Sequence, residues 1–288
     1  MSACATSPDA TPVPDATTVL NTPTPTPSPP APATQEPVEP PESSSAPSAT
    51  PARNHRLDPR PLFPSTEPSP PAEAQAWMSD PATAPGKVVF LTFDDGPNNV
   101  TTPRILDILA AADVDATFFV VGSEVPQAPE VLRKTVEQGN RIALHSVTHD
   151  YDKMYPGRSA NAERAAQEFD GTLQAVRDVL GADFTTTAWR YPGGHMSWDN
   201  MDASDKALAD RGATWVDWNA LTGDAEPENR RPTTSDAMVS MATQPVTDGY
   251  KVVVLLAHDS PGKDLTVDSL PRIIEAYRAA GYTFATLS

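Results

Sequence analysis

The stretch KVVFLTFDDGP, residues 87–97, contains the features that decide the fold. Its first seven residues are mostly apolar, which is typical of a strand buried on both faces of a sheet. Two adjacent carboxylates, Asp94 and Asp95, follow the strand, and Gly96 and Pro97 continue with residues that favour a turn. A buried strand that ends in charged side chains indicates a parallel sheet with a site at the carboxyl ends of its strands.

Short apolar runs recur along the rest of the chain and predict six further strands. Their ranges are 116–122, 141–147, 185–190, 213–217, 250–258 and 283–287. Between them, Ala162–Leu180 and Val267–Tyr277 carry apolar residues at helical spacing, and Thr102 with Pro103 is predicted to cap and begin a helix. About seven parallel strands with helical crossovers predict an α/β fold, either a barrel or a doubly wound sheet.

The composition changes N-terminal to this sheet. Of the 33 prolines in the 288 residues, 22 lie before Leu91, among Ser, Thr, Ala and Glu. Such a segment has too little apolar surface to offset the entropy lost when its backbone is ordered. We therefore predict a disordered Pro/Ser/Thr/Ala-rich tether over residues 1–84 and a folded domain over residues 85–288.

Charge and cysteine content narrow the functional classes. The formal net charge is −17 and no basic stripe is present, which argues against nucleic acid as a partner. The chain contains no run of 18 apolar residues, so the sequence predicts no transmembrane span in this chain. The single cysteine, Cys4, follows small residues and precedes the long tether, as in the lipid-attachment site of bacterial lipoproteins. We therefore expect an extracytoplasmic protein of the bacterial cell envelope, either anchored through Cys4 or secreted.

Polar side chains interrupt the apolar pattern where five of the predicted strands end. In chain order these residues are Asp94 and Asp95, His145 and His149, Arg190, Asp217, and His258. Because the carboxyl ends of parallel strands open onto one face, we expect these side chains to converge on one site.

A carboxylate and two imidazoles in this set suit a divalent transition metal. Asp95, His145 and His149 are the candidate ligands, and they leave positions open for water and substrate. Zn²⁺ is the expected ion, with Co²⁺ and Ni²⁺ as alternatives. A pair of histidines four residues apart also occurs without a metal, and Asp-Asp-Gly-Pro is ordinary turn chemistry. Convergence with the other strand ends favours the functional interpretation.

The remaining strand-end residues suggest how protons would move at such a site. Asp94 is a candidate general base, and Arg190 is placed to hold its carboxylate ionised. His258 could protonate a leaving group, with Asp217 fixing its tautomer. The alternative is that both residues have only structural roles. Arg190 would then form a surface ion pair, and His258 would be a hydrogen-bonded histidine of the core.

Five ordered segments of the chain resemble the motifs of the NodB-type polysaccharide deacetylases, carbohydrate esterase family 4. The segments are Thr92–Pro97, His145–His149, Arg190–Gly194, Asp217–Trp218 and Leu256–His258. The resemblance covers about 200 residues. The sequence around Asp224 and His258 is similar to that of the bacterial cell-wall branch of this family.

The resemblance implies a distorted (β/α) barrel and a metal-dependent hydrolase that releases acetate from an N-acetylated or O-acetylated sugar. It implies the same roles for the seven strand-end residues, an oxyanion contact from the backbone N–H near Gly193, and an acetyl pocket lined by Trp218 and Leu256. Many family members have a tyrosine where Gly193 stands here, which puts substrate contacts of this loop in question.

The leading interpretation of the sequence is a deacetylase of a cell-wall polysaccharide, with peptidoglycan as the expected substrate and chitooligosaccharide or xylan as alternatives. Three other functions stay open. They are an O-deacetylase of acetylxylan or another secreted polysaccharide, a non-catalytic carbohydrate-binding barrel, and a phosphate-transfer site built on Asp94 and Asp95. No glycine-rich phosphate loop precedes a helix, which disfavours the last.

Overall fold

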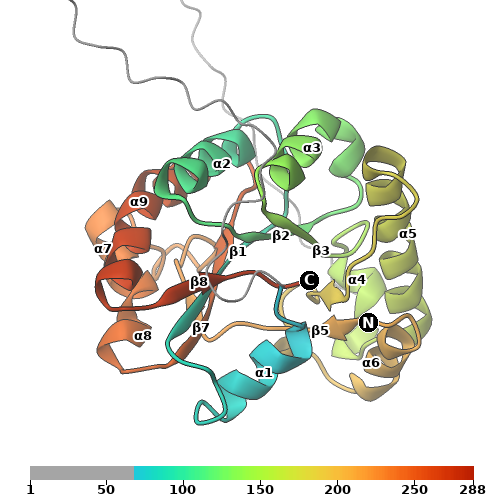
Figure 1. Ribbon diagram of the computed structural model, residues 1–288. Coiled ribbons are helices and arrows are strands. Elements are labelled where there is room, and N and C mark those ends of the chain that lie inside the picture. The colour runs from blue at the N-terminus through green and yellow to red at the C-terminus, as the bar shows by residue number, and fades with distance from the viewer. Residues whose placement is uncertain (1–67) are drawn as a thin grey trace, which may run out of the picture. The chain divides into compact units, whose positions relative to one another are not determined.

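The computed structural model describes residues 68–288, and a parallel sheet lies at the centre of this part of the chain (Figure 1). The strands are β1 (Val88–Asp94), β2 (Thr117–Val120), β3 (Arg141–Leu144), β4 (Ala188–Trp189), β5 (Thr214–Trp215), β6 (Ala220–Leu221), β7 (Val252–His258) and β8 (Thr283–Ala285). Every named pair of strands runs parallel. The predicted α/β class and barrel-like sheet are thereby confirmed.

The strand order across the sheet is β5-β4-β3-β2-β1-β7-β6. One edge of β1 pairs with β7 along its whole length, and the other edge pairs with β8 over Val88–Phe90 and with β2 over Thr92–Asp94. Seven strands fall within the predicted ranges or start beside them. The eighth, β6, was not predicted because two residues carry no periodicity.

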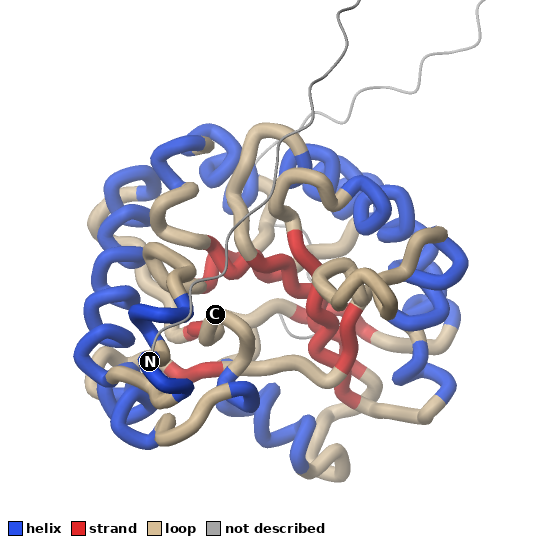
Figure 2. The backbone as a smooth tube through the Cα atoms, turned by 180° about the vertical axis from the view of Figure 1, so that it is seen from behind, coloured by secondary structure: helices blue, strands red, loops and turns tan. Residues whose placement is uncertain are grey.

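Helices pack around the sheet (Figure 2). They are α1 (Pro71–Ser79), α2 (Thr101–Ala112), α3 (Pro129–Glu137), α4 (Tyr151–Met154), α5 (Ala162–Leu180), α6 (Asp202–Ala209), α7 (Ser235–Ala242), α8 (Gln244–Thr247) and α9 (Asp264–Ala279). Three 3₁₀ turns complete the elements, η1 (Val125–Gln127), η2 (Pro156–Arg158) and η3 (His195–Ser197). No helix within residues 68–288 combines the length and the hydropathy that a bilayer crossing needs.

The two faces of β1 pack into different clusters. Val89, Leu91 and Phe93 join the large cluster between the sheet and the outer helices. Val88 and Phe90 face the inside of the curl, in a smaller cluster. Since side chains alternate along a strand, Thr92 and Asp94 lie on the same inner face as Val88 and Phe90, toward the carboxyl end. The candidate site is therefore built on the inner face of the sheet.

Helix α1 covers the inner face at the other end of the strands. Figure 1 shows α1 lying between β7 and β5, and Ala74 of this helix is fully buried in the inner cluster. Trp77 stacks on Phe90 with ring centroids 6.5 Å apart. Composition alone placed residues 71–79 in a disordered tether, and for this segment that prediction is wrong. A few apolar side chains suffice because the sheet supplies their partners. Cys4 and the rest of residues 1–67 lie outside the described residues.

Helix α2 begins differently from the prediction. Its first residue is Thr101, and the Asn98 side chain accepts hydrogen bonds from the N–H groups of Val100 at 2.9 Å and Thr101 at 2.7 Å. Thr102 was expected to cap the helix, but its hydroxyl instead donates to the buried carboxylate of Asp259 at 2.6 Å. Asp259 follows β7, so this bond ties the first turn of α2 to the end of β7.

Candidate active and metal site

Asp95, His145 and His149 lie together at the carboxyl ends of β1 and β3. One possible ligand atom from each lies within 4.8 Å of those of the other two. Asp95 Oδ1 is 3.6 Å from His145 Nε2 and 3.4 Å from His149 Nε2. The three residues predicted from the sequence as metal ligands are thus brought together around one point.

The chemistry of this cluster fits a divalent cation. Asp95 Oδ1 is buried and has no hydrogen-bond partner among the described residues, an arrangement that a cation would satisfy. His145 Nδ1 lies 2.8 Å from the carbonyl oxygen of Arg190, so Nδ1 donates and Nε2 keeps its lone pair. Burial, with the neighbouring His149, lowers the pKa of His145 to about 3, which keeps the ring neutral as a metal ligand requires.

The loop between the two histidines is held by a buried glutamate that the sequence did not single out. Glu168, in α5, is 0% exposed and accepts from the backbone N–H groups of Val147 at 2.6 Å and Thr148 at 2.8 Å. The Thr148 hydroxyl donates to the same carboxylate at 2.6 Å, and Arg164 pairs with it. In the sequence, Glu168 is one acidic residue among several in an amphipathic helix, so no local signal marks it.

We expect Glu168→Gln to weaken metal binding by about 10- to 100-fold, the usual effect of losing an outer partner of a ligand. Both N–H groups bond Oε2 of Glu168, whereas Oε1 accepts from the Thr148 hydroxyl and from Arg164. A glutamine has only one acceptor oxygen, so its NH₂ group would replace Oε1, where it cannot accept and faces the Arg164 guanidinium. Competition with a chromophoric chelator measures the affinity. Glu163→Gln, an exposed change in the same helix, is the matched control. An unchanged affinity in folded Glu168→Gln would contradict the role of this residue.

Asp94 and Arg190 form a buried ion pair beside the cluster. Arg190 is 0% exposed, and its Nη1 donates to Asp94 Oδ1 at 2.8 Å and is 2.8 Å from Thr92 Oγ1. Asp94 Oδ2 is 3.6 Å from His145 Nε2. Burial raises the pKa of Asp94, although the Arg190 guanidinium opposes that rise. The arrangement leaves Asp94 with one oxygen bound to Arg190 and the other facing the candidate metal ligands.

His258 is paired with Asp224, and the predicted partner, Asp217, was wrong. Asp224 Oδ1 lies 2.7 Å from His258 Nδ1, and Asp224 Oδ2 accepts from the His258 backbone N–H at 2.9 Å. Burial lowers the pKa of His258, but the hydrogen bond and charge of Asp224, together with the charges of Asp94 and Asp95, outweigh burial and raise this pKa overall. The strand order explains the correction. Asp224 follows β6, which pairs with β7, whereas Asp217 follows β5 at the opposite edge of the sheet.

Asp217 holds a neighbouring loop instead. Its carboxylate accepts from the backbone N–H groups of His195 at 2.8 Å and Met196 at 3.0 Å. Gly193 lies in this loop at φ 77°, and no hydrogen bond from its N–H is found within residues 68–288. That N–H is consequently available to a ligand. The loop is thus positioned by a buried carboxylate at its base.

Trp218 and Leu256, the two residues expected to line an acetyl pocket, both lie near the buried pair of Asp94 and Arg190 or near His258. The Trp218 ring lies 5.6 Å from the Arg190 guanidinium carbon. Leu256 is two residues before His258 in β7, so both side chains project from the same face of the strand. Both residues therefore border the group formed by Asp94, Arg190 and His258.

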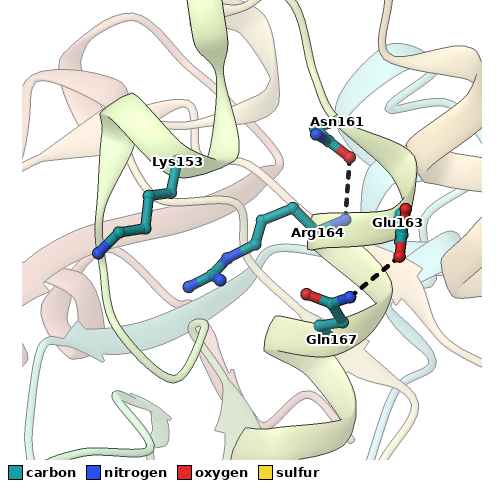
Figure 3. Close-up of a pocket in the computed structure, with 5 residues that line it drawn as sticks. All are labelled: Lys153, Asn161, Glu163, Arg164 and Gln167. Carbon is teal, nitrogen blue, oxygen red and sulfur yellow. Dashed lines mark hydrogen bonds between the residues drawn. The ribbon is translucent and has the colours of Figure 1, made fainter.

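The described surface has two hollows to compare, and one of them adjoins the metal-ligand cluster. One, of about 310 Å³, opens directly on Asp95 and His149 and is also lined by Asn98, Glu124 and Ser260. The other, of about 360 Å³, lies over the start of α5 and is lined by Lys153, Asn161, Glu163, Arg164 and Gln167. Figure 3 shows Arg164 extending from α5 toward Lys153 in this second hollow. The first hollow contains candidate ligands and is the one suited to a substrate.

Comparison with known proteins gives one consistent result. Residues 82–211 match a family model described as polysaccharide deacetylase. The chain is 32% identical over 209 residues to a chitooligosaccharide deacetylase of Sinorhizobium fredii, which covers 69% of this chain and 89% of that protein. It is 26% identical over 206 residues to a peptidoglycan-N-acetylglucosamine deacetylase of Bacillus cereus, which covers 70% of this chain and 87% of that protein.

A bifunctional xylanase/deacetylase of Pseudobutyrivibrio xylanivorans is 31% identical over 204 residues, which covers 70% of this chain. The chain spans only 30% of the length of that relative. Among solved structures, a CE4 esterase of Streptococcus mutans superposes with a TM-score of 0.72 at 41% identity, which covers 77% of this chain and 92% of that one. The segment that matches the family model contains strands β1 to β4 and the three candidate metal ligands.

Proposed function

Because the chain belongs to the polysaccharide deacetylase family, we propose that it hydrolyses acetyl groups on N-acetylated sugars of a cell-wall polysaccharide, with peptidoglycan as the substrate. The observation that carries this proposal is the convergence of two proton-transfer pairs, Asp94 with Arg190 and His258 with Asp224, beside one candidate metal cluster. A relative that acts on peptidoglycan N-acetylglucosamine supports the choice of polymer.

Asp95, His145 and His149 would hold the divalent cation, for which Zn²⁺ is our proposal. When bound, such a cation supplies Lewis acidity for the acetyl carbonyl and for water. Asp94 takes a proton from the attacking water through its oxygen that is free of Arg190. The water oxygen forms a bond to the acetyl carbon, and the negative charge that develops on the carbonyl oxygen is met by the free N–H of Gly193.

His258 completes the reaction by protonating the sugar nitrogen. An amide nitrogen leaves readily only as a neutral amine, so a proton must arrive as the C–N bond breaks. Asp224 occupies Nδ1 of His258, which leaves Nε2 to donate this proton. The products are acetate and a free amino sugar. Asp224 supports the positive ring before the proton is transferred.

Acetate release from purified peptidoglycan, chitooligosaccharide and acetylxylan tests the proposal. We expect release from the first two substrates, and an enzymatic acetate assay measures it. Preferential release from acetylxylan would instead support O-deacetylation, the second candidate, which the xylanase/deacetylase relative favours. Binding of a polysaccharide with no acetate released from any of the three would support a non-catalytic barrel.

We expect Asp224→Asn to lower kcat about 10- to 100-fold at neutral pH and to shift the alkaline limb of the pH profile downward. The Asp224 carboxylate raises the pKa of His258, and the acid must be protonated to act. Without the carboxylate that pKa falls, so activity is lost at a lower pH as the pH rises. A pH–rate profile measures this, with Asp236→Asn, which removes an exposed carboxylate, as the control. An unshifted alkaline limb would contradict the pairing.

We also propose that residues 68–288 constitute the catalytic domain and that the protein acts outside the cytoplasm. Peptidoglycan lies outside the cytoplasmic membrane, so an enzyme that modifies the mature polymer must reach it there. Lipid attachment at Cys4 stays a prediction from the sequence. Mass spectrometry of the protein isolated from cells tests the attachment.

A further inference from the structure

One large aromatic side chain is exposed beside the candidate metal ligands. Tyr151 is 43% exposed, and its ring centroid lies 5.2 Å from that of His149. Tyr151 follows the second histidine by two residues, at the first position of α4. No hydrogen bond to its side chain is found within residues 68–288. An exposed ring at this place has no evident role in holding the fold.

A second aromatic group fixes the position of Tyr151. Trp198, from the loop after β4, meets the Tyr151 ring edge-on with centroids 5.4 Å apart. Trp198 is itself stacked on the buried Tyr155, at 4.0 Å and an interplanar angle of 9°. The Trp198 Nε1–H donates to the carbonyl oxygen of Pro192 at 2.9 Å. The Tyr151 ring thus has a preformed support, so that binding would cost little side-chain ordering.

Gly193 makes room for this support. A Cβ atom at position 193 would lie 3.2 Å from Trp198 Cζ2, closer than ordinary contact, and the residue has a φ of 77°. A larger residue here would press on the Trp198 ring and strain the backbone. The glycine therefore lets Trp198 lie against the loop and support Tyr151.

We propose that Tyr151, supported by Trp198, forms a subsite that stacks on the sugar unit next to the one that is deacetylated; this rests on the proposed function. The flat face of a pyranose ring presents C–H groups, which pack favourably on the electron-rich face of an aromatic ring. The 5.2 Å between Tyr151 and His149 is comparable with the length of one sugar unit. An uncharged N-acetylated sugar needs no ionic partner, and Tyr151 offers it only contact area.

The test compares substrates that reach this subsite with one that does not. The metal-loaded full chain is assayed with the β-1,4-linked pentamer of N-acetylglucosamine and with a small aryl acetate ester. We expect Tyr151→Ala to lower the ratio of kcat/KM on the pentamer to kcat/KM on the ester about 10-fold. Tyr151→Phe keeps the stacking ring and should restore most of the ratio. Tyr250→Ala removes an equally exposed tyrosine, 42% exposed, at the opposite end of β7, and should leave the ratio unchanged.

Binding gives a readout that does not depend on turnover. Pentamer affinity is measured by calorimetry in Asp94→Asn, with and without Tyr151→Ala, and we expect a loss of about 10-fold. If the wild-type chain releases no acetate but the affinity falls with Tyr151→Ala, the proposed function fails and the sugar subsite stands. If Tyr151→Ala lowers kcat/KM equally on the pentamer and on the ester, or leaves pentamer affinity unchanged, the proposed subsite is overturned.

Discussion

Asp94→Asn should reduce kcat for acetate release by about 10³-fold, the scale of a lost general base. An amide cannot take the proton that the attacking water gives up. The asparagine oxygen can still accept the 2.8 Å hydrogen bond that Arg190 donates to Asp94 Oδ1, so the geometry of the pair is largely kept. Initial rates of acetate release from peptidoglycan or chitooligosaccharide, with metal present, measure the effect.

The control for this change is Asp236→Asn, which also removes an aspartate paired with an arginine. Arg272 Nη1 contacts Asp236 at 2.6 Å, but this pair lies at the surface and far along the chain from the candidate ligands. We expect wild-type rates from that variant. Thermal unfolding of both variants separates a loss of chemistry from a loss of fold. A rate for folded Asp94→Asn within 10-fold of the wild type would rule out Asp94 as the general base.

Removing the metal should abolish acetate release, and His145→Ala should prevent its recovery. Wild-type protein treated with a chelator is expected to regain activity when Zn²⁺ is added back, since Asp95, His145 and His149 are all present. His145 would supply one of three ligands from a position that is 3% exposed, so its loss would leave an incomplete site. Metal content measured by atomic absorption should fall in parallel with activity.

His195→Ala provides the matched control for metal content. His195 is also a partly buried histidine beside a carboxylate, 2.9 Å from Asp205, but it stacks on Trp215 and lies outside the cluster of candidate ligands. We expect the His195→Ala variant to keep one equivalent of metal. Full activity of the chelated wild-type protein, or full metal content in His145→Ala, would contradict the assigned site.

Much of this fold was predictable because buried strands leave a local pattern. Seven strands and the long helix α5 (Ala162–Leu180) were found from runs and spacing of apolar residues, which report burial directly. Several elements escaped, and two of them show the reason. Strand β6 has two residues, too few for any period, and α1 is amphipathic only weakly within a proline-rich stretch. Both are stabilised by the neighbours that tertiary structure brings to them.

The identity of the candidate ligands was also predictable, because each sits at the end of a predicted strand. Asp95, His145 and His149 lie within reach of one another as expected, and Arg190 contacts Asp94. Parallel strands make this possible, since their carboxyl ends share one edge. Which of these strand-end residues are neighbours along that edge was not predictable, because it depends on the order of the strands in the sheet.

The sequence by itself determined most of the chemical groups in the site, because polar residues that end apolar strands are visible without the tertiary structure. Only the tertiary structure decided which groups are partners. Between β5 and β6 the chain crosses from one edge of the sheet to the other, so Asp224 and not Asp217 reaches His258. Glu168 and Tyr151 likewise acquire their places from helices packed beside the His145–His149 loop. Such contacts join residues tens of positions apart, and local periodicity carries no information about them.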